Sequence, residues 1–544
     1  MDKEPGAPAS SLMEPNVVVE LASGTRPPLV KQHRRSSPGG QALHRWHRQG
    51  KYTTIHIVYE LDEPITKEAL VELVDVALLQ RFPRFRGYVS TNERYWCVPD
   101  KVDATRYVEM VDLSTDGTDA DVEAALQQHV ARSLGQDLPE QCSWQAQLVT
   151  CSGAAERCFV IWRIAHTVAD GVILSQIMSN VLCKPLVKNP DPGETPSTPS
   201  VLNPAGLSVK VKNLRSPPAR VGLCERLRCL VGGVAFVLAL IFWPSDPRTP
   251  IKLGPYKWER RERARRAAKG LSGLALATDA SHPPPPPADA VPVAVEDERE
   301  RLLLGVMLPV AVDELKAAAA FARVSVNDLL LAAMAGGIRA YLSKMEPHTP
   351  LAASLQIHAV AVINPRPVMP QMGLGGASEL LNDYAAMKGP GCDITLGILP
   401  LPCGELPART RLERVARATR FIKISPETYL LRLLANLLVR SLGLSTLLAL
   451  YKVILAKFTT YVSNVVAPPV AGSLCGVRIK RIFFGTAPLD FGVSFSFLSY
   501  AGQCTLTCTS DAETVPSPQL MTDCVRAHLL EQMAAAKEAA PAGK

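Results

Sequence analysis

The stretch Arg157-Cys-Phe-Val-Ile-Trp-Arg-Ile-Ala-His-Thr-Val-Ala-Asp-Gly171 decides the fold of this chain. Its apolar run from Cys158 to Trp162 is short and rich in β-branched and aromatic residues, which is typical of a buried central strand. His166 follows directly, and the apolar spacing over 172–182 then predicts a helix. The motif HxxxDG therefore lies where a strand leaves a sheet and a helix begins.

A histidine in this position suits acyl transfer to an alcohol. A free alcohol is a poor nucleophile at neutral pH, and an imidazole that takes its proton accelerates attack by roughly 10²–10⁴-fold. Asp170 would act on the imidazole or hold the loop by pairing with an arginine, and Gly171 would permit a close backbone approach or a sharp turn. Because HxxxDG also arises by chance, a structural His166 is the alternative.

Strands and helices alternate along the rest of the chain, which predicts an α/β architecture. In the first half we expect strands over 52–59, 87–90 and 144–149, and helices over 66–80 and 119–134. In the second half we expect strands over 301–310, 357–364 and 460–464, helices over 312–321, 325–342, 407–423 and 517–536, and strands over 477–485, 491–500 and 503–510 that close a sheet.

The length of 544 residues predicts two domains, because a single core stops growing near roughly 250–300 residues. A proline run at 283–287 marks the linker between them. The expected division is a disordered tail (1–40), an N-terminal domain with HxxxDG (41–200), a crossover linker (201–299), a C-terminal domain (300–536) and a second tail (537–544).

Charge and cysteine content exclude several classes of function. The net charge is +8, and much of the excess lies in the linker over 248–269, which favours a phosphate-bearing ligand or an anionic membrane over nucleic acid. No zinc-finger spacing or RNP-like motif is present. The 13 cysteines include no CxxC pair, so we expect reduced, buried thiols and no metal site.

Two apolar segments indicate contact with a membrane. Residues 229–243 form a run of about 15 apolar residues, whereas a spanning helix needs roughly 20. A re-entrant segment, an interfacial segment and a short span all stay open, as does a linker helix with no membrane contact. Residues 429–462 are apolar but carry four cationic residues, which predicts an amphipathic helix in the membrane interface or a pair of core helices.

At this point the residues resemble those of a known family. The segment from Trp162 to Gly171 is similar to the active-site motif of the wax ester synthase/diacylglycerol acyltransferase family, the bifunctional type of bacteria and plants. Five further segments, two before this motif and three after it, occur in the order found in that family and extend the resemblance over residues 44–536. They are Pro83–Arg86, Leu138–Val149, Val326–Gly337, Ser463-Asn464 with the prolines beyond it, and Leu498–Gly502.

The resemblance implies two chloramphenicol-acetyltransferase-like domains with a tunnel between them. It implies acyl-CoA as a co-substrate with no cofactor, and diacylglycerol or a long-chain alcohol as the acceptor. It assigns His166 as the general base, Asp170 as a structural aspartate and Gly171 as the adjacent glycine. Because the acceptors live in lipid, we expect association with a membrane, that of the endoplasmic reticulum, with the active site facing the cytosol.

The same resemblance names supporting residues. Arg366 is the candidate arginine for Asp170, unless it is a solvated loop residue. Asn327 and its neighbour Asp328 match a motif at a helix start, where Asn327 belongs to the site or only caps the helix. Asn464, which follows Ser463, either donates a hydrogen bond to the oxyanion or braces the domain interface.

Two departures from the family keep other functions open. Ala165 stands where the family usually has a first histidine, and the family's proline before Trp144 is missing. One alternative is an HxxxDG acyltransferase of a small polar alcohol or amine, since Asp490-Phe-Gly492 resembles part of that group's DFGWG loop. The other alternative is a lipid-binding protein without catalytic activity.

Overall fold

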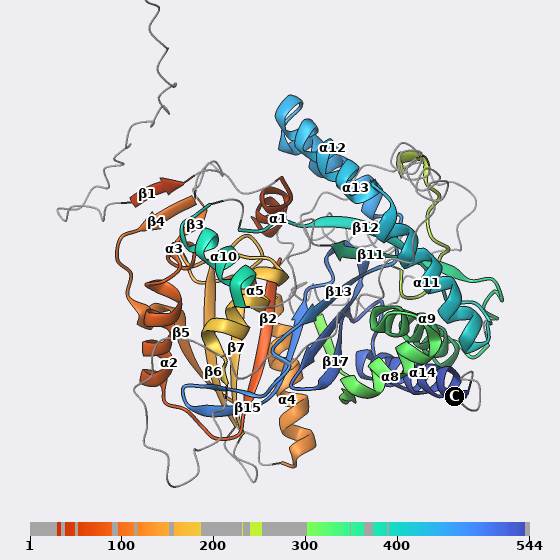
Figure 1. Ribbon diagram of the computed structural model, residues 1–544, viewed down its shortest axis with the longest axis horizontal. Coiled ribbons are helices and arrows are strands. Elements are labelled where there is room, and N and C mark those ends of the chain that lie inside the picture. Colours follow the sequence, from red (N-terminus) through yellow and green to blue (C-terminus); the bar gives the residue numbers. More distant parts are fainter. Residues whose placement is uncertain are drawn as a thin grey trace, which may run out of the picture.

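The computed structural model contains two seven-stranded sheets, with helices packed against them (Figure 1). The structure describes residues 30–33, 38–48, 53–89, 96–113, 117–151, 157–185, 231, 240–252, 302–348, 350–363, 374–388 and 391–538. Most of the predicted N-terminal tail, the proline run, the basic stretch of the linker and most of the apolar run 229–243 lie outside these ranges. Within the predicted tail, β1 (Val30–His33) pairs with β4 (Trp96–Pro99).

The N-terminal sheet has β7 near its centre, as the apolar run predicts. The side chains of Cys158 to Trp162 are at most 1% exposed, and β7 is antiparallel to both its neighbours. The order of this sheet is β5 (Val108–Asp112), β6 (Trp144–Cys151), β7 (Arg157–Ala165), β2 (Thr54–Leu61), β15 (Val477–Thr486), β14 (Gly472–Leu474) and β8 (Lys184–Pro185).

The helices of this half follow the predicted spans closely. The predicted helix over 119–134 is α4 (Asp119–Leu134), and Thr66 caps α2 (Lys67–Leu73) by accepting a bond from the amide of Ala69 at 3.2 Å. The remaining elements are α1 (Pro38–Arg48), η1 (Val74–Leu79), α3 (Pro83–Arg86), β3 (Tyr88–Val89), η2 (Ala104–Tyr107), α5 (Gly171–Ile177) and η3 (Met178–Leu182).

The C-terminal sheet is mixed, and one of its faces is covered by helices. The helices α8 (Val312–Ala322), α9 (Val326–Met345) and α14 (Pro518–Glu538) lie side by side on it (Figure 1), with α11 (Ala408–Ile424) beside them. The order of the strands is β10 (Val310–Ala311), β17 (Gln503–Asp511), β16 (Val493–Tyr500), β13 (Thr460–Val466), β11 (Gln356–Ile363) and β12 (Thr395–Pro402), while β9 (Leu302–Val306) also pairs with β17.

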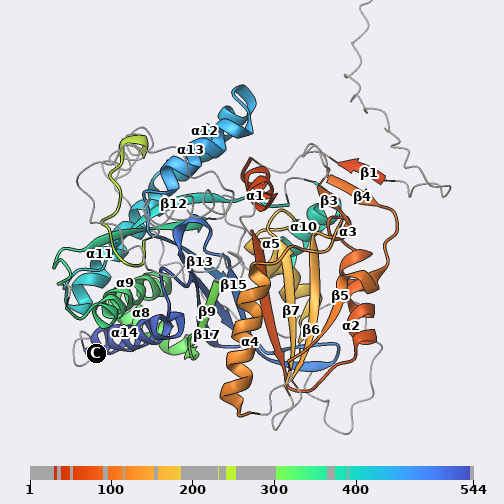
Figure 2. The same ribbon diagram turned by 180° about the vertical axis from the view of Figure 1, so that it is seen from behind.

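Two strands from the C-terminal half, β14 and β15, belong to the N-terminal sheet, which the sequence does not reveal. On one side β15 pairs with β14, its neighbour in the chain, and on the other it pairs antiparallel with β2, from Ile479 opposite Leu61 to Thr486 opposite Ile55. Leu304 of β9 packs in turn among apolar residues of the N-terminal half. Figure 2 shows α4 between the N-terminal sheet and β9. The two bodies therefore share a continuous apolar contact.

The apolar segment 429–462 is two helices followed by a strand. The helices α12 (Glu427–Ser441) and α13 (Leu444–Leu455) are separated by Gly443, whose φ is +85°. They form a hairpin that projects from the body of the molecule (Figure 1). Of the two predicted alternatives, a single amphipathic helix and a pair of helices, the structure has the pair, because Gly443 adopts a left-handed conformation that ends α12.

Among the residues that the structure describes, no single helix is long and apolar enough to cross a membrane. The helices α8 and α9 meet that criterion only as a pair, bent by 94°. Most of α9 is buried against α14 and the sheet, so its apolar character is that of a core helix. The remaining described elements are η4 (Leu240–Phe242), α10 (Leu374–Ala385) and η6 (Leu489–Phe491).

Candidate active site

A cavity of about 1070 Å³ lies between the two halves of the molecule. Its volume slightly exceeds the roughly 300–1,000 Å³ usual for ligand pockets. Its wall is formed by residues of β2, α5 and β15 on one side and of β11, β12 and β13 on the other, with α12 and α13 along it. Most of these residues are apolar, the polar ones include His166, Asp170, Ser463 and Asn464, and Gly171 also lines the cavity. The cavity therefore joins predicted site residues from both halves.

His166 begins the turn that follows β7 and is half-buried in the cavity wall. Its backbone N–H donates to the carbonyl of Thr53 at 3.1 Å, which fixes the turn to the start of β2. Burial lowers the pKa of the His166 imidazole, while a hydrogen bond to its own backbone and the charge of Asp170 raise it. The net lowering keeps the ring neutral at neutral pH, which is the form that accepts a proton.

Cys392 contacts His166 from the other half of the molecule. Its Sγ lies 3.4 Å from Nδ1 of the imidazole, and its side chain is fully buried. Cys392 is 226 positions from His166 and belongs to no motif, so the sequence alone does not point to it. The contact orients the ring through Nδ1.

Asp170 holds the loop after His166 in place. Its carboxylate is 2% exposed, and Oδ1 accepts bonds from the amides of Val172 and Ile173, each at 3.1 Å, so Asp170 caps α5. Oδ2 accepts a bond from the amide of Asp393 at 2.9 Å. Of the two predicted roles, these contacts support holding the loop, and the partners are backbone amides. Arg366 lies outside the described residues.

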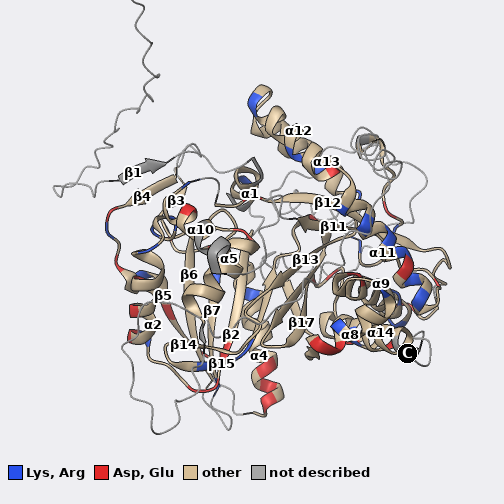
Figure 3. Ribbon diagram, viewed as in Figure 1, with Lys and Arg blue, Asp and Glu red and all other residues tan. Residues whose placement is uncertain are grey.

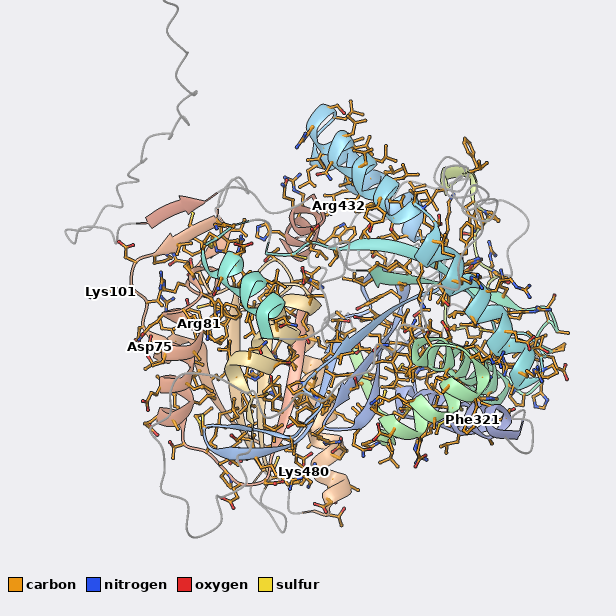
Figure 4. The ribbon with its side chains drawn as sticks, viewed as in Figure 1. Asp75, Arg81, Lys101, Phe321, Arg432 and Lys480 are labelled. Carbon is orange, nitrogen blue, oxygen red and sulfur yellow. The ribbon has the colours of Figure 1, made fainter. Side chains whose placement is uncertain are left out.

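Asp393 carries this connection on to the projecting hairpin. Its Oδ2 accepts a bond at 2.8 Å from Nη2 of Arg432, which belongs to α12. Arg432 lies between the hairpin and the body of the molecule (Figure 4). The sequence shows Arg432 only as a charge that interrupts an apolar segment, so its role in an ion pair emerges from the tertiary structure.

Gly171 lies where the start of α5 approaches β13. A Cβ on Gly171 would lie 3.3 Å from Cγ2 of Val465, which is closer than ordinary contact. The hydroxyl of Ser175 also donates to the carbonyl of Val466 in β13. Gly171 therefore serves a close approach between the two halves.

Residues from another part of the chain also fix the turn from His166 to Asp170. Tyr384 donates from its hydroxyl to the carbonyl of Val168 at 3.0 Å. A Cβ on Gly391 would lie 2.4 Å from that same carbonyl, so no larger residue fits there without movement.

Asn464 and Asn327 meet across the interface between β13 and α9. Nδ2 of Asn464 donates to Oδ1 of Asn327 at 3.1 Å, and both Asn464 and Ser463 line the cavity. This contact lies within the C-terminal half, so the predicted brace between the two domains stays a prediction, and the second N–H of the Asn464 amide group is a further donor.

Asp328 has a structural role at the start of α9. It forms a reciprocal capping box with Ser325, in which the Ser325 amide donates to Oδ2 at 2.8 Å. The hydroxyl of Thr419 in α11 donates to Oδ1 at 2.5 Å. Since Ser325 is the N-cap, capping does not explain Asn327.

The motifs that precede HxxxDG in the sequence pack beneath it. Nε1 of Trp144 donates to the carbonyl of Phe85 at 2.7 Å, and the Trp144 ring stacks on that of Trp162. These residues are buried in the N-terminal core. They support β7 and do not line the cavity.

Comparison with known proteins agrees with this architecture. Residues 391–532 match the model of the WS/DGAT C-terminal domain. No curated protein sequence matches the chain. The chain is similar to the solved wax ester synthase/diacylglycerol acyltransferase from Marinobacter aquaeolei VT8, with a TM-score of 0.53 and 14% identity over 93% of this chain and 100% of that chain.

A second solved structure shares the same fold. It is the trichothecene 15-O-acetyltransferase from Fusarium sporotrichioides, with a TM-score of 0.51 and 11% identity over 92% of this chain and 96% of that chain. At these identities the likeness establishes the fold, so the predicted pair of acyltransferase-type α/β domains is confirmed. The family resemblance is confirmed for residues 391–532, the part of the chain that the family model matches. The tunnel stays a prediction.

Proposed function

Because the chain carries the WS/DGAT C-terminal domain on an acyltransferase fold, we propose that it is an O-acyltransferase with His166 as its general base. The acyl donor is acyl-CoA, and the acceptor is diacylglycerol, a long-chain alcohol, or both. One observation supports this most strongly, namely that a half-buried histidine with a lowered pKa lies in the wall of a large, mostly apolar cavity.

In this mechanism His166 first accepts a proton from the acceptor alcohol and later donates a proton to the CoA thiolate. In the tautomer this step requires, Nδ1 carries the ring proton and faces Sγ of Cys392, and Nε2 takes the proton of the acceptor hydroxyl as its oxygen attacks the thioester carbonyl. The tetrahedral intermediate collapses with cleavage of the C–S bond, and the CoA thiolate receives the proton from the imidazolium. The second N–H of Asn464 is our candidate donor to the oxyanion. No cofactor takes part.

The apolar wall of the cavity favours a lipid acceptor over a small polar one. Leucines of α12 and α13 form much of that wall, and burying a methylene group is worth about 0.8 kcal/mol. In the segment Asp490-Phe-Gly492, Phe491 is buried and lines the cavity, and Gly492 is followed by Val493 at the start of β16. We therefore place the acyltransferase of small polar acceptors second.

Under this proposal the protein works at the membrane of the endoplasmic reticulum with the active site facing the cytosol. Acyl-CoA is water-soluble and the acceptors are dissolved in lipid, so the reaction needs both phases. Exposed apolar side chains on the hairpin support such a location.

The test is an assay of the purified protein in detergent with labelled palmitoyl-CoA. Diacylglycerol and hexadecanol are offered separately, and His166→Ala is the control. We expect labelled triacylglycerol or wax ester at a rate that falls by about 10²–10⁴-fold in the variant. Absence of neutral-lipid product from both acceptors would contradict the lipid assignment. Lipid binding by the wild-type and variant proteins without turnover would instead identify a lipid-binding protein.

A further inference from the structure

The hairpin of α12 and α13 is apolar on two opposite faces. Its inner face, which includes Leu431 and Leu438 of α12 and Leu450 of α13, lines the cavity. Its outer face bears Tyr429, Leu433, Leu437, Leu442 and Val453, which are 55–65% exposed. The first three recur every four residues and so form one stripe along α12.

An exposed helix face is normally polar, and a helix that is apolar all round is normally buried. No described part of the chain buries the outer face of this hairpin, because its apolar side chains remain more than half exposed. Phe242 of η4, an element that contacts α13, is also exposed, at 85%. Such a surface is typical of a binding site.

The charge of the hairpin indicates what binds there. Between residues 428 and 457 the sequence contains four cationic residues and no acidic one. Arg440 and Lys452 are exposed, and Figure 3 shows cationic residues on the hairpin. Apolar side chains beside Lys and Arg are typical of helices that bind an anionic lipid surface. Two copies of the chain that met symmetrically through this face would bring like charges together.

We propose that the outer face of the α12–α13 hairpin docks on an anionic lipid bilayer, so that a lipid acceptor passes between the two helices into the cavity. The passage of the acceptor rests on the proposed function, whereas the docking does not. The helices have 15 and 12 residues, and a spanning helix needs roughly 20. The hairpin therefore lies in the bilayer interface, at a depth of about 5–10 Å.

The test is co-flotation of the full chain with vesicles of phosphatidylcholine, with and without phosphatidylserine. The variant is Leu433→Gln with Leu437→Gln, since neither residue lines the cavity. The matched control is Phe321→Gln, an exposed apolar residue on α8, away from the hairpin (Figure 4). Each buried leucine accounts for about tenfold in partitioning, so we expect the double variant to bind about 100-fold more weakly and the control to bind like wild type.

A second variant tests the charge. Arg440→Gln with Lys452→Gln should remove most of the preference for phosphatidylserine, because each cation near an anionic surface contributes about fivefold. Unchanged binding of both double variants would overturn the proposal. The proposal would also be overturned if the wild-type protein were a dimer that bound no vesicles and the leucine variant were a monomer.

Activity separates this inference from the proposed function. With a short-chain acyl-CoA and a short-chain alcohol in solution, the leucine variant should turn over at the wild-type rate, while its rate on vesicle-borne diacylglycerol falls with its binding. Docking without any turnover would contradict the proposed function and leave the docking surface intact.

Discussion

The two walls of the cavity are held in position by different interactions. The wall around His166 is fixed by hydrogen bonds between buried groups, with Asp170 accepting three backbone amides. The wall formed by α12 and α13 is mostly apolar, with six leucines among its lining residues, and Arg432 of α12 connects it to Asp393. We therefore expect the wall around His166 to be the more rigid of the two.

The largest expected effect comes from removing the carboxylate of Asp170. Asp170→Ala leaves three amides near the start of α5 without their acceptor, and each buried unpaired group costs about 1–3 kcal/mol. Because the amides of Val172 and Ile173 can partly turn to water, we expect a loss of about 2–4 kcal/mol in the free energy of unfolding. Urea denaturation measures it.

Asp170→Asn is the matched control for that substitution. It keeps an oxygen to cap α5 but turns an NH₂ group toward the amide of Asp393. We expect roughly half the destabilisation of Asp170→Ala. If both variants unfold at the wild-type urea concentration, the carboxylate does not hold this wall.

The second prediction concerns the pH dependence of the reaction. Burial lowers the pKa of His166 below the ordinary value of 6.5, so the neutral base persists as the pH falls through 6.5. We expect the acidic limb of kcat/KM to have its midpoint below 6.5 and then to fall about tenfold per pH unit. A midpoint above 6.5 would contradict the burial of the base.

The lowered pKa of His166 also makes the free energy of unfolding depend on pH. The unfolded chain binds the proton of His166 at a higher pH than the folded chain does, so this group destabilises the folded state as the pH falls through 6.5. His166→Gln, which does not titrate, should lose that part of the pH dependence in urea denaturation.

A smaller effect is expected where the two walls meet. Arg432→Gln removes the ion pair with Asp393, and the arginine side chain is 40% exposed, so screening limits the loss of stability to about 1 kcal/mol or less. A double-mutant cycle with Asp393→Asn measures the coupling between them. Arg440→Gln on the same helix is the control and should leave stability unchanged. Zero coupling would show that the walls are independent.

Local patterns predicted most of the elements but not how they cross between the halves. The helix α4 and the buried strand β7 follow from periodicity alone, since each is defined by its own residues. The pairing of β15 with β2 joins residues more than 400 positions apart, and the sequence of neither strand indicates its partner. Gly443 separates α12 from α13, although the apolar pattern of the sequence runs through it without interruption.

The site shows the same limit. His166, Asp170 and Gly171 form a motif within six positions, so the sequence identifies them together. Cys392 and Asp393 reach the same loop from the other half through a thiol and a backbone amide. A backbone contact carries no residue signature, so only the tertiary structure reveals it.

The smallest expected effect tests how closely the first wall approaches β13. The Cβ of Gly171→Ala lies 3.3 Å from Cγ2 of Val465, so the neighbouring strand must shift by a few tenths of an ångström. Alanine also favours the first turn of α5, by up to about 1 kcal/mol. The two effects nearly cancel, and we expect a change in unfolding free energy below about 1 kcal/mol. In a Val465→Ala background the contact is absent, so Gly171→Ala should be stabilising there. If Gly171→Ala has the same effect in both backgrounds, the contact with Val465 is not what requires glycine at this position.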